Sequence, residues 1–171
     1  MHCKKIIQTV LLLLLLFLLA VIVVKIINRK DDNEYPLQLP AFSFSTLQGA
    51  AITLDTVTCE YSIVIFYSPG CTFCEHEGTE LSRNYRQFHH SKLFFITMEQ
   101  LDSAKAYTER HKLLVSPNYY SLVDTTRMAA LAFNLNTIPT TFIYDRNKKL
   151  IHSFTGEVNA KKLLTLLKDD E

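Results

Sequence analysis

The hydrophobic positions of the chain form one long N-terminal run and a series of shorter runs after it. Residues 6–27 are almost wholly apolar, and residues 10–24 are apolar without interruption. A helix needs about 20 mainly apolar residues to cross a bilayer. No small-x-small cleavage site follows the run, so the pattern favours an uncleaved membrane anchor over residues 1–27 rather than a cleavable secretory signal.

The polar and apolar positions after this run indicate a tether and one domain. Residues 28–34 are polar, and Pro36 and Pro40 end the polar stretch. We therefore predict a tether over residues 28–40. The remaining residues, 41–171, are of a normal length for one compact domain and contain no internal repeat.

Within residues 41–171 the pattern alternates between strands and helices. Two apolar runs, residues 61–67 and 92–98, are typical of strands buried on both faces of a sheet. Short strands are expected at residues 41–45 and 51–54, and a hairpin at residues 140–145 and 150–155. Helices are expected at residues 75–88, 103–111, 126–135 and 159–167, with Asp102 as the N-cap of the second. This order predicts an α/β fold with a central mixed β-sheet flanked by helices.

Charge is distributed unevenly along the chain. The first 30 residues contain five basic and no acidic side chains, which leaves 13 basic and 17 acidic side chains for the rest. A mildly acidic domain without a basic run is not expected to bind nucleic acid, because phosphate contacts need concentrated Lys and Arg. The basic residues on the two sides of the apolar run nearly balance, so they do not decide its orientation. The segment before the apolar run is only a few residues long, so we expect it to stay in the cytosol. The chain is then a single-pass cell-membrane protein with its domain outside the cytosol, in the periplasm.

The main candidate for chemistry is the motif Cys71-Thr72-Phe73-Cys74, which lies between a predicted strand and a predicted helix. A thiol at a helix N-terminus lies over unpaired N–H groups and the positive end of the helix dipole, which favours its thiolate. The second thiol is one turn away and can form a disulfide with it. This arrangement indicates a thioredoxin-like redox site. A zinc site is the alternative, but it needs two more ligands at similar spacing, and Cys3 and Cys59 stand alone.

The order of elements, with the dithiol at the start of the first long helix, resembles the thioredoxin superfamily. The segment Thr137-Ile138-Pro139-Thr140 strengthens the resemblance, because it places a proline directly before a predicted strand. The resemblance implies that Pro139 follows a cis peptide bond beside the dithiol and that Ile138 presents its backbone to an extended substrate chain. A proline that simply begins a strand is the alternative.

Within this superfamily, residues 36–168 are most similar to the membrane-anchored TlpA/ResA-like thiol–disulfide oxidoreductases. The spacing Cys-x-x-Cys-x-x-Glu adds Glu77, for which the resemblance implies a role as proton relay to Cys74 or as a charge that raises the pKa of a sulfur. A first-turn acid stabilised by the helix dipole is the alternative. The chain departs from the family in having Gly70 instead of Trp before the first cysteine, and from thioredoxin in having Ile65 instead of a buried Asp.

The predicted function is disulfide exchange with substrate proteins. Cys71 is expected to be the low-pKa nucleophile that attacks a substrate disulfide, and Cys74 is expected to resolve the mixed disulfide. This chemistry requires no metal and no organic cofactor, and the resemblance implies a membrane thiol electron donor. The intervening pair Thr72-Phe73 tunes the redox potential but leaves open whether the protein reduces or oxidises its substrates.

Two other functions stay open at this point. Copper delivery by a protein of the same fold uses two cysteines and a distant histidine, for which His111 and His152 are candidates, but that family spaces its cysteines by three residues. A peroxiredoxin-like peroxidase has a Pro-x3-Thr-x2-Cys frame, which Pro69 does not fit because it is too close to Cys71. Cys59 is expected to be a small structural residue.

Overall fold

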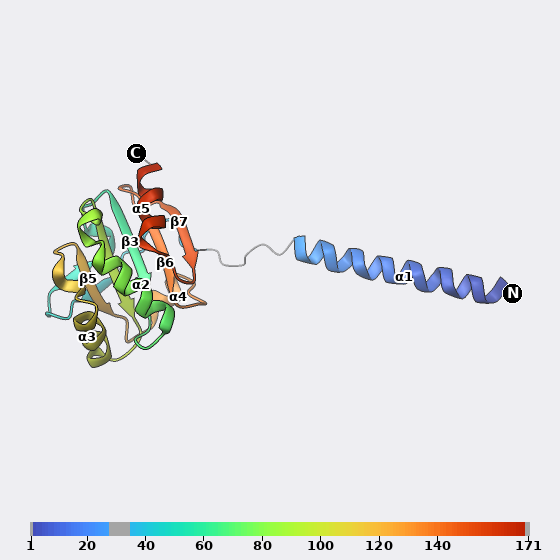
Figure 1. The fold of residues 1–171 in the computed structure, drawn as a ribbon, viewed down its shortest axis with the longest axis horizontal. Coiled ribbons are helices and arrows are strands. Elements are labelled where there is room, and N and C mark those ends of the chain that lie inside the picture. The colour runs from blue at the N-terminus through green and yellow to red at the C-terminus, as the bar shows by residue number, and fades with distance from the viewer. Residues whose placement is uncertain (1, 28–34, 170–171) are drawn as a thin grey trace. The chain divides into compact units, whose positions relative to one another are not determined.

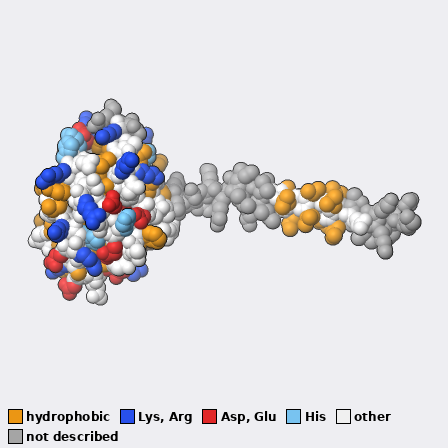
Figure 2. Space-filling view, viewed as in Figure 1, with side chains coloured by type: hydrophobic (Ala, Val, Ile, Leu, Met, Phe, Trp, Pro, Cys, Tyr) orange, Lys and Arg blue, Asp and Glu red, His pale blue; other side chains and the backbone are white. Residues whose placement is uncertain are grey.

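The computed structural model describes residues 2–27 and 35–169, which belong to two compact units, Met1–Glu34 and Tyr35–Glu171 (Figure 1). The first unit contains helix α1, His2–Ile27. Its leucines at positions 11–16 and Phe17 are exposed (Figure 2). Within the described part of the chain, no helix is long and apolar enough to cross a membrane. The membrane anchor over residues 1–27 stays a prediction.

The second unit is built on a five-stranded sheet with the order β5-β4-β3-β6-β7 (Figure 1). Its strands are β3 (Tyr61–Phe66), β4 (Ser91–Thr97), β5 (Tyr119–Val123), β6 (Thr140–Tyr144) and β7 (Leu150–Thr155). The first three are parallel to one another, and β6 pairs antiparallel with both β3 and β7. Strands β1 (Ser43–Ser45) and β2 (Ala51–Thr53) form a separate antiparallel pair. The central mixed sheet of the predicted fold class is confirmed.

Every residue of the central strand β3 is buried, because helices and loops cover both faces of the sheet. On one face, Ile63 and Ile65 belong to a core cluster with residues of α2 (Thr72–Arg83), α3 (Leu101–Arg110) and α5 (Ala160–Asp169). On the other face, Val64 and Phe66 belong to a second cluster with residues of α4 (Met128–Ala132) and the β1–β2 segment. The sheet therefore forms the middle layer of the domain.

Several predicted elements differ from those observed. Strand β5 was not predicted, although it contributes Tyr119 and Leu122 to the two cores. The helix predicted at residues 126–135 is reduced to α4. The helix predicted at residues 75–88 begins three residues earlier and ends at Arg83. Three short 3₁₀ helices lie between the main elements, at Leu54–Thr56, Tyr85–Phe88 and Leu113–Val115.

The predicted N-cap of α3 is wrong. Asp102 lies in the first turn of α3, where its charge still suits the helix dipole, and Gln100 occupies the N-cap position with extended backbone angles. Residues 28–34 of the predicted tether lie outside the described residues. Its last residues contact the domain, since Leu39 is buried and its N–H donates to the carbonyl of Lys148 at 2.8 Å.

Candidate active site

A tight turn after the central strand β3 positions the dithiol at the end of that strand. The N–H of Cys71 donates to the carbonyl of Ser68 at 3.1 Å, and Gly70 has φ +86°. With Pro69 and Gly70 as its central residues, this is the sequence and geometry of a type II turn, which needs a positive φ at its third position. Glycine adopts that angle without steric cost, so the turn accounts for the glycine before the first cysteine.

The turn places Cys71 at the N-cap of α2 and Cys74 one turn inside the helix. Cys71 has extended backbone angles, and its carbonyl accepts the N–H of Glu75 at 2.9 Å. Cys71 is half-buried, whereas Cys74 is only 1 % exposed, and both are free thiols. Burial, together with the neighbouring Cys71 and Glu77, raises the pKa of Cys74 to about 12, although a hydrogen bond with the backbone of Ser68 opposes the shift. One thiol is therefore accessible and the other is held protonated beneath it.

Glu77 lies on the same face of α2 as Cys74, three residues further along. It is 1 % exposed, and the hydroxyl of Thr141 donates to its Oε1 at 2.8 Å. Its Oε2 is buried and has no hydrogen-bond partner among the described residues. Burial raises the pKa of Glu77 to about 8, and the carboxylate of Glu157 adds to this, although the Thr141 hydrogen bond opposes it. The carboxyl group therefore exchanges its proton near neutral pH.

The proline motif lies at the same end of the sheet. Phe66 at the end of β3 pairs with Thr140 at the start of β6, so the residues before β6 lie next to the turn that leads to Cys71. The Ile138–Pro139 peptide bond is cis, as the resemblance implied. Ile138 is partly buried and packs against the core cluster that contains Cys74, as does Cys71.

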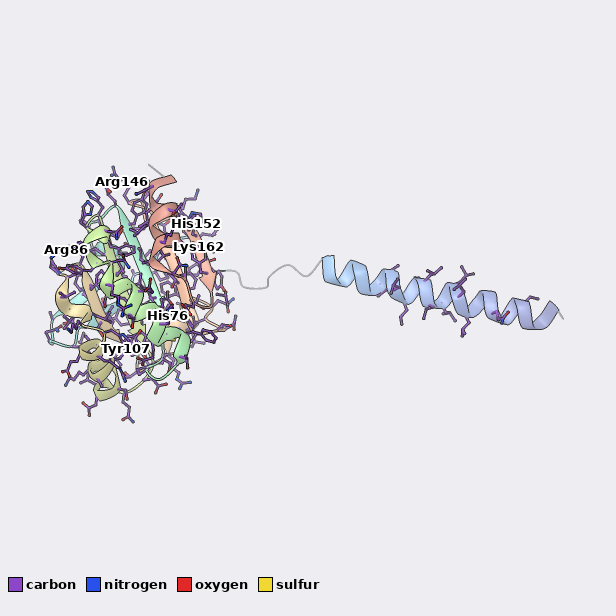
Figure 3. All side chains as sticks on the ribbon, in the orientation of Figure 1. His76, Arg86, Tyr107, Arg146, His152 and Lys162 are labelled. Atoms are coloured by element: carbon purple, nitrogen blue, oxygen red, sulfur yellow. The ribbon has the colours of Figure 1, made fainter. Side chains whose placement is uncertain are left out.

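A buried tyrosine that was not among the predicted site residues supports the dithiol helix. Tyr107 lies on α3 (Figure 3). Its hydroxyl donates to the carbonyl of Cys74 at 2.6 Å, and its ring packs on that of Tyr67 with centroids 4.1 Å apart. Gly78 permits this approach, because a Cβ at that position would collide with the Tyr107 hydroxyl. No local signal marks this contact, since it joins residues 33 positions apart.

The structure does not place His111 and His152, the candidates for copper binding, in one cluster with the dithiol. His111 hydrogen-bonds through both ring nitrogens, Nδ1 to Thr79 at 3.2 Å and Nε2 to Glu75 at 2.7 Å. His152 lies on β7, with its ring centroid 6.3 Å from that of Phe154. In the parts of the chain that the structure describes, no group of three or more His, Cys, Asp or Glu side chains is placed to hold a metal ion.

Residues 37–153 match the sequence profile of the AhpC/TSA family. The chain belongs to the AhpC/TSA family. A comparison with curated proteins finds no significant match. The family assignment agrees with the predicted resemblance to thioredoxin-fold oxidoreductases. It also supports the prediction that the chain is a redox enzyme.

Solved structures share the fold of this AhpC/TSA-family chain. A secreted disulfide oxidoreductase from Mycobacterium tuberculosis is 17 % identical, with TM-score 0.65, over 75 % of this chain and 96 % of that one. StoA from Bacillus subtilis is 19 % identical, with TM-score 0.63, over 76 % and 98 %. The peroxidoxin BcpB from Mycobacterium tuberculosis is 16 % identical, with TM-score 0.69, over 80 % and 97 %. The predicted thioredoxin fold is thereby confirmed.

Proposed function

We propose that the chain is a thiol–disulfide oxidoreductase that exchanges disulfides with substrate proteins through Cys71 and Cys74. One observation carries this proposal: the accessible Cys71 caps α2, and the buried Cys74 lies one turn below it. Cys71 is accessible to a substrate disulfide, and burial keeps the Cys74 thiol protonated until it is needed. The solved structure of the secreted M. tuberculosis protein, called a disulfide oxidoreductase, has the same fold.

The exchange is a pair of thiolate displacements. The Cys71 thiolate attacks one sulfur of a substrate disulfide, the substrate S–S bond breaks, and the leaving thiolate takes up a proton. Cys74 then loses its proton and attacks the Cys71 sulfur, which releases the second substrate thiol. The substrate gains two electrons and two protons, and Cys71 and Cys74 become a disulfide. The reverse sequence oxidises a substrate dithiol.

Glu77 is the proposed proton relay for the second step. Cys74 has a raised pKa and must be deprotonated before it attacks, and Glu77 is the buried carboxyl group one turn away on the same helix face. A group with a pKa of about 8 both accepts and releases a proton near neutral pH. Its Oε2, which has no partner among the described residues, is free to take part in the transfer.

Ile138 and Pro139 are the proposed support for an extended substrate segment. They directly precede β6, whose first residues pair with the end of β3 from which the dithiol turn departs. The carbonyl of Pro139 already accepts the N–H of Gly156 at 2.8 Å. We therefore assign the backbone of Ile138 to hydrogen bonding with the substrate.

We also propose that residues 1–27 attach the domain to a membrane, outside the cytosol, where a membrane thiol donor supplies electrons. This rests on the apolar run of the sequence and on the exposed leucines of α1. Protease added to spheroplasts should then digest the domain, and the mature chain should retain its N-terminus. Protection of the domain, or a mature N-terminus near residue 30, would contradict the proposal.

Peroxide reduction is the second candidate, because the AhpC/TSA family and the fold of BcpB, called a peroxidoxin, both point to it. Insulin reduction and hydrogen peroxide consumption, each with dithiothreitol as electron donor, separate the two. We expect the wild type to accelerate insulin reduction strongly and peroxide consumption weakly. Cys71→Ser should lose the insulin activity, whereas Cys59→Ser, the matched control at a cysteine outside the motif, should retain it. Fast peroxide consumption without insulin reduction would overturn the proposal.

A further inference from the structure

A cavity of about 550 Å³ lies beside the carboxyl end of β5. Its lining comes from residues 42–47, which include β1, from Leu101 at the start of α3, and from residues 123–126. An antiparallel bridge between Thr46 and Leu122 holds the first of these segments beside β5. The volume of the cavity is within the range of ligand-binding pockets.

The lining of this cavity combines apolar side chains with hydroxyl groups and presents no free charge among the described residues. Its apolar members are Phe42, Phe44, Leu47, Leu101 and Val123. Asp124 is the one ionisable residue of the lining, and it is buried. Its two carboxylate oxygens accept the hydroxyl of Thr126 at 3.1 Å and the N–H of Ala130 at 2.9 Å. The cavity therefore suits an uncharged, largely apolar group.

The cavity lies at the same end of the sheet as the dithiol. β3, β4 and β5 are parallel, so their carboxyl ends meet at one edge, where Cys71 follows β3 and the cavity adjoins β5 (Figure 1). Neighbouring strands are about 4.8 Å apart, so the ends of β3 and β5 are about 10 Å apart. In the turn before Cys71, the hydroxyl of Ser68 donates to Glu99 at 3.4 Å, and Glu99 is two residues before Leu101. The cavity is therefore continuous with the proposed exchange site.

A substrate segment held at the dithiol reaches this cavity if it continues across β4. Ile138, the proposed support for the segment, precedes β6 on the other side of β3. An extended chain advances about 3.3 Å per residue, and the side chains two and four residues from a cysteine point to the same side as that cysteine. These two side chains lie about 7 and 13 Å from the cysteine, which brackets the distance of about 10 Å between the strand ends.

We propose that the cavity is a substrate subsite that takes a large apolar side chain two or four residues from the reacting cysteine of the substrate polypeptide. The inference rests on the proposed function, because it concerns the substrate of the Cys71–Cys74 exchange. Only a polypeptide contacts the dithiol and the cavity at once, so the subsite distinguishes protein disulfides with a nearby apolar residue from small disulfides. The uncharged lining disfavours a charged side chain at the same position.

Reduction of synthetic peptides by the reduced full-length chain tests the subsite. Each peptide is rich in Ser and Gly, has one cysteine as a mixed disulfide with 2-mercaptoethanol, and carries one Phe, or Ser in its place, one to four residues before or after the cysteine. Cys71 and Cys74 give two electrons to the mixed disulfide and become a disulfide, while the peptide thiol and 2-mercaptoethanol are released. Alkylation and mass spectrometry give the single-turnover rate constants.

We expect a Phe two or four residues from the cysteine, on one side of it, to raise the second-order rate constant roughly five- to twentyfold over Ser, because the cavity buries part of the ring. A Phe one or three residues away should raise it less than twofold. Equal rate constants for all the Phe and Ser peptides overturn the inference. A wild-type chain that reduces none of the peptides refutes the proposed function itself, on which the inference rests.

Thr125→Trp places a large ring at the cavity, because Thr125 is an exposed member of its lining. The ratio of the Phe to the Ser rate constant should then fall below twofold. This ratio compares two peptides with the same protein, so a general loss of activity cancels. Thr58→Trp is the matched control, since Thr58 is also exposed but lines a separate cavity before the start of β3. It should keep the wild-type ratio, and an unchanged ratio in Thr125→Trp overturns the inference.

A photo-crosslink locates the side chain without a change in the cavity. Cys74→Ser is trapped with a peptide whose cysteine is activated as a 2-thiopyridyl disulfide and whose preferred Phe is replaced by p-benzoylphenylalanine. Irradiation, proteolysis and mass spectrometry should show crosslinks to residues 42–47, to Leu101 or to residues 123–126. Crosslinks to other parts of the domain alone overturn the inference, even if Thr125→Trp fails to fold.

Discussion

Replacing Glu77 by Gln should change how the stability of the domain depends on pH. The glutamine keeps the size of the side chain and an oxygen that can accept from Thr141, but it cannot ionise. In the wild type, burial raises the pKa of Glu77 to about 8, from an ordinary value of 4.5. Below pH 4.5 the Glu77 carboxyl group is protonated in both the folded and the unfolded chain. In that range its ionisation therefore does not make the stability depend on pH.

Between pH 4.5 and about 8 the unfolded chain releases this proton while the folded chain keeps it. The free energy of unfolding therefore falls as the pH rises through this window. Each factor of ten in proton affinity is worth about 1.4 kcal/mol, so the whole window corresponds to a loss of at most roughly 5 kcal/mol. Glu77→Gln lacks this loss and should be the more stable form at pH 8.5.

Urea denaturation of the reduced full-length chain at pH 5 and pH 8.5 measures this difference. Tyrosine fluorescence reports on the domain alone, since all eight tyrosines follow residue 34 and the chain has no tryptophan. Glu80→Gln is the matched control, because Glu80 lies on the same helix but is partly exposed and pairs with Arg83 at 3.9 Å. Parallel losses of stability in the wild type and Glu77→Gln, within about 0.5 kcal/mol, would refute an elevated Glu77 pKa.

Three further substitutions test the packing and the turn. Gly78→Ala should lower the stability in thermal unfolding by about 1–3 kcal/mol. The new methyl group would collide with Tyr107, and the cost of this overpacking exceeds the ~1 kcal/mol gain in helix propensity. An unchanged Tm would contradict this. Gly70→Ala should cost about 1–2 kcal/mol and slow insulin reduction, because φ +86° strains any side chain; full activity would count against it. Leu163→Ala in α5 should cost about 2–5 kcal/mol, since Leu163 is fully buried; a cost below 1 kcal/mol would disprove it.

The strands and the dithiol were predictable because their signals are local. β3 and β4 are mainly apolar runs, and the β6–β7 hairpin has its turn residues between two strand-like segments. The order of these elements around Cys71-Thr72-Phe73-Cys74 then indicates the fold. Pro139 before β6 is equally visible in the sequence.

The missed features depend on contacts between distant segments. β5 is a short run rich in tyrosine whose assignment needs the parallel pairing with β4. The predicted helix at residues 126–135 contains apolar residues that the sheet buries, such as Phe133, without continuing the helix. The pairing of Glu75 with His111 crosses 36 residues and two helix ends, and no sequence period marks it.

In the proposed exchange, Cys71 attacks the substrate disulfide and Cys74 resolves the mixed disulfide. Incubation of Cys74→Ser and Cys71→Ser with a disulfide-bonded substrate, followed by non-reducing electrophoresis and mass spectrometry, tests it most directly. Cys74→Ser should accumulate a mixed disulfide at Cys71, because attack proceeds at the half-buried thiol and resolution cannot follow. Cys71→Ser should form none. A mixed disulfide that accumulates on Cys74 in Cys71→Ser, with none in Cys74→Ser, would show that the two cysteines have the opposite roles.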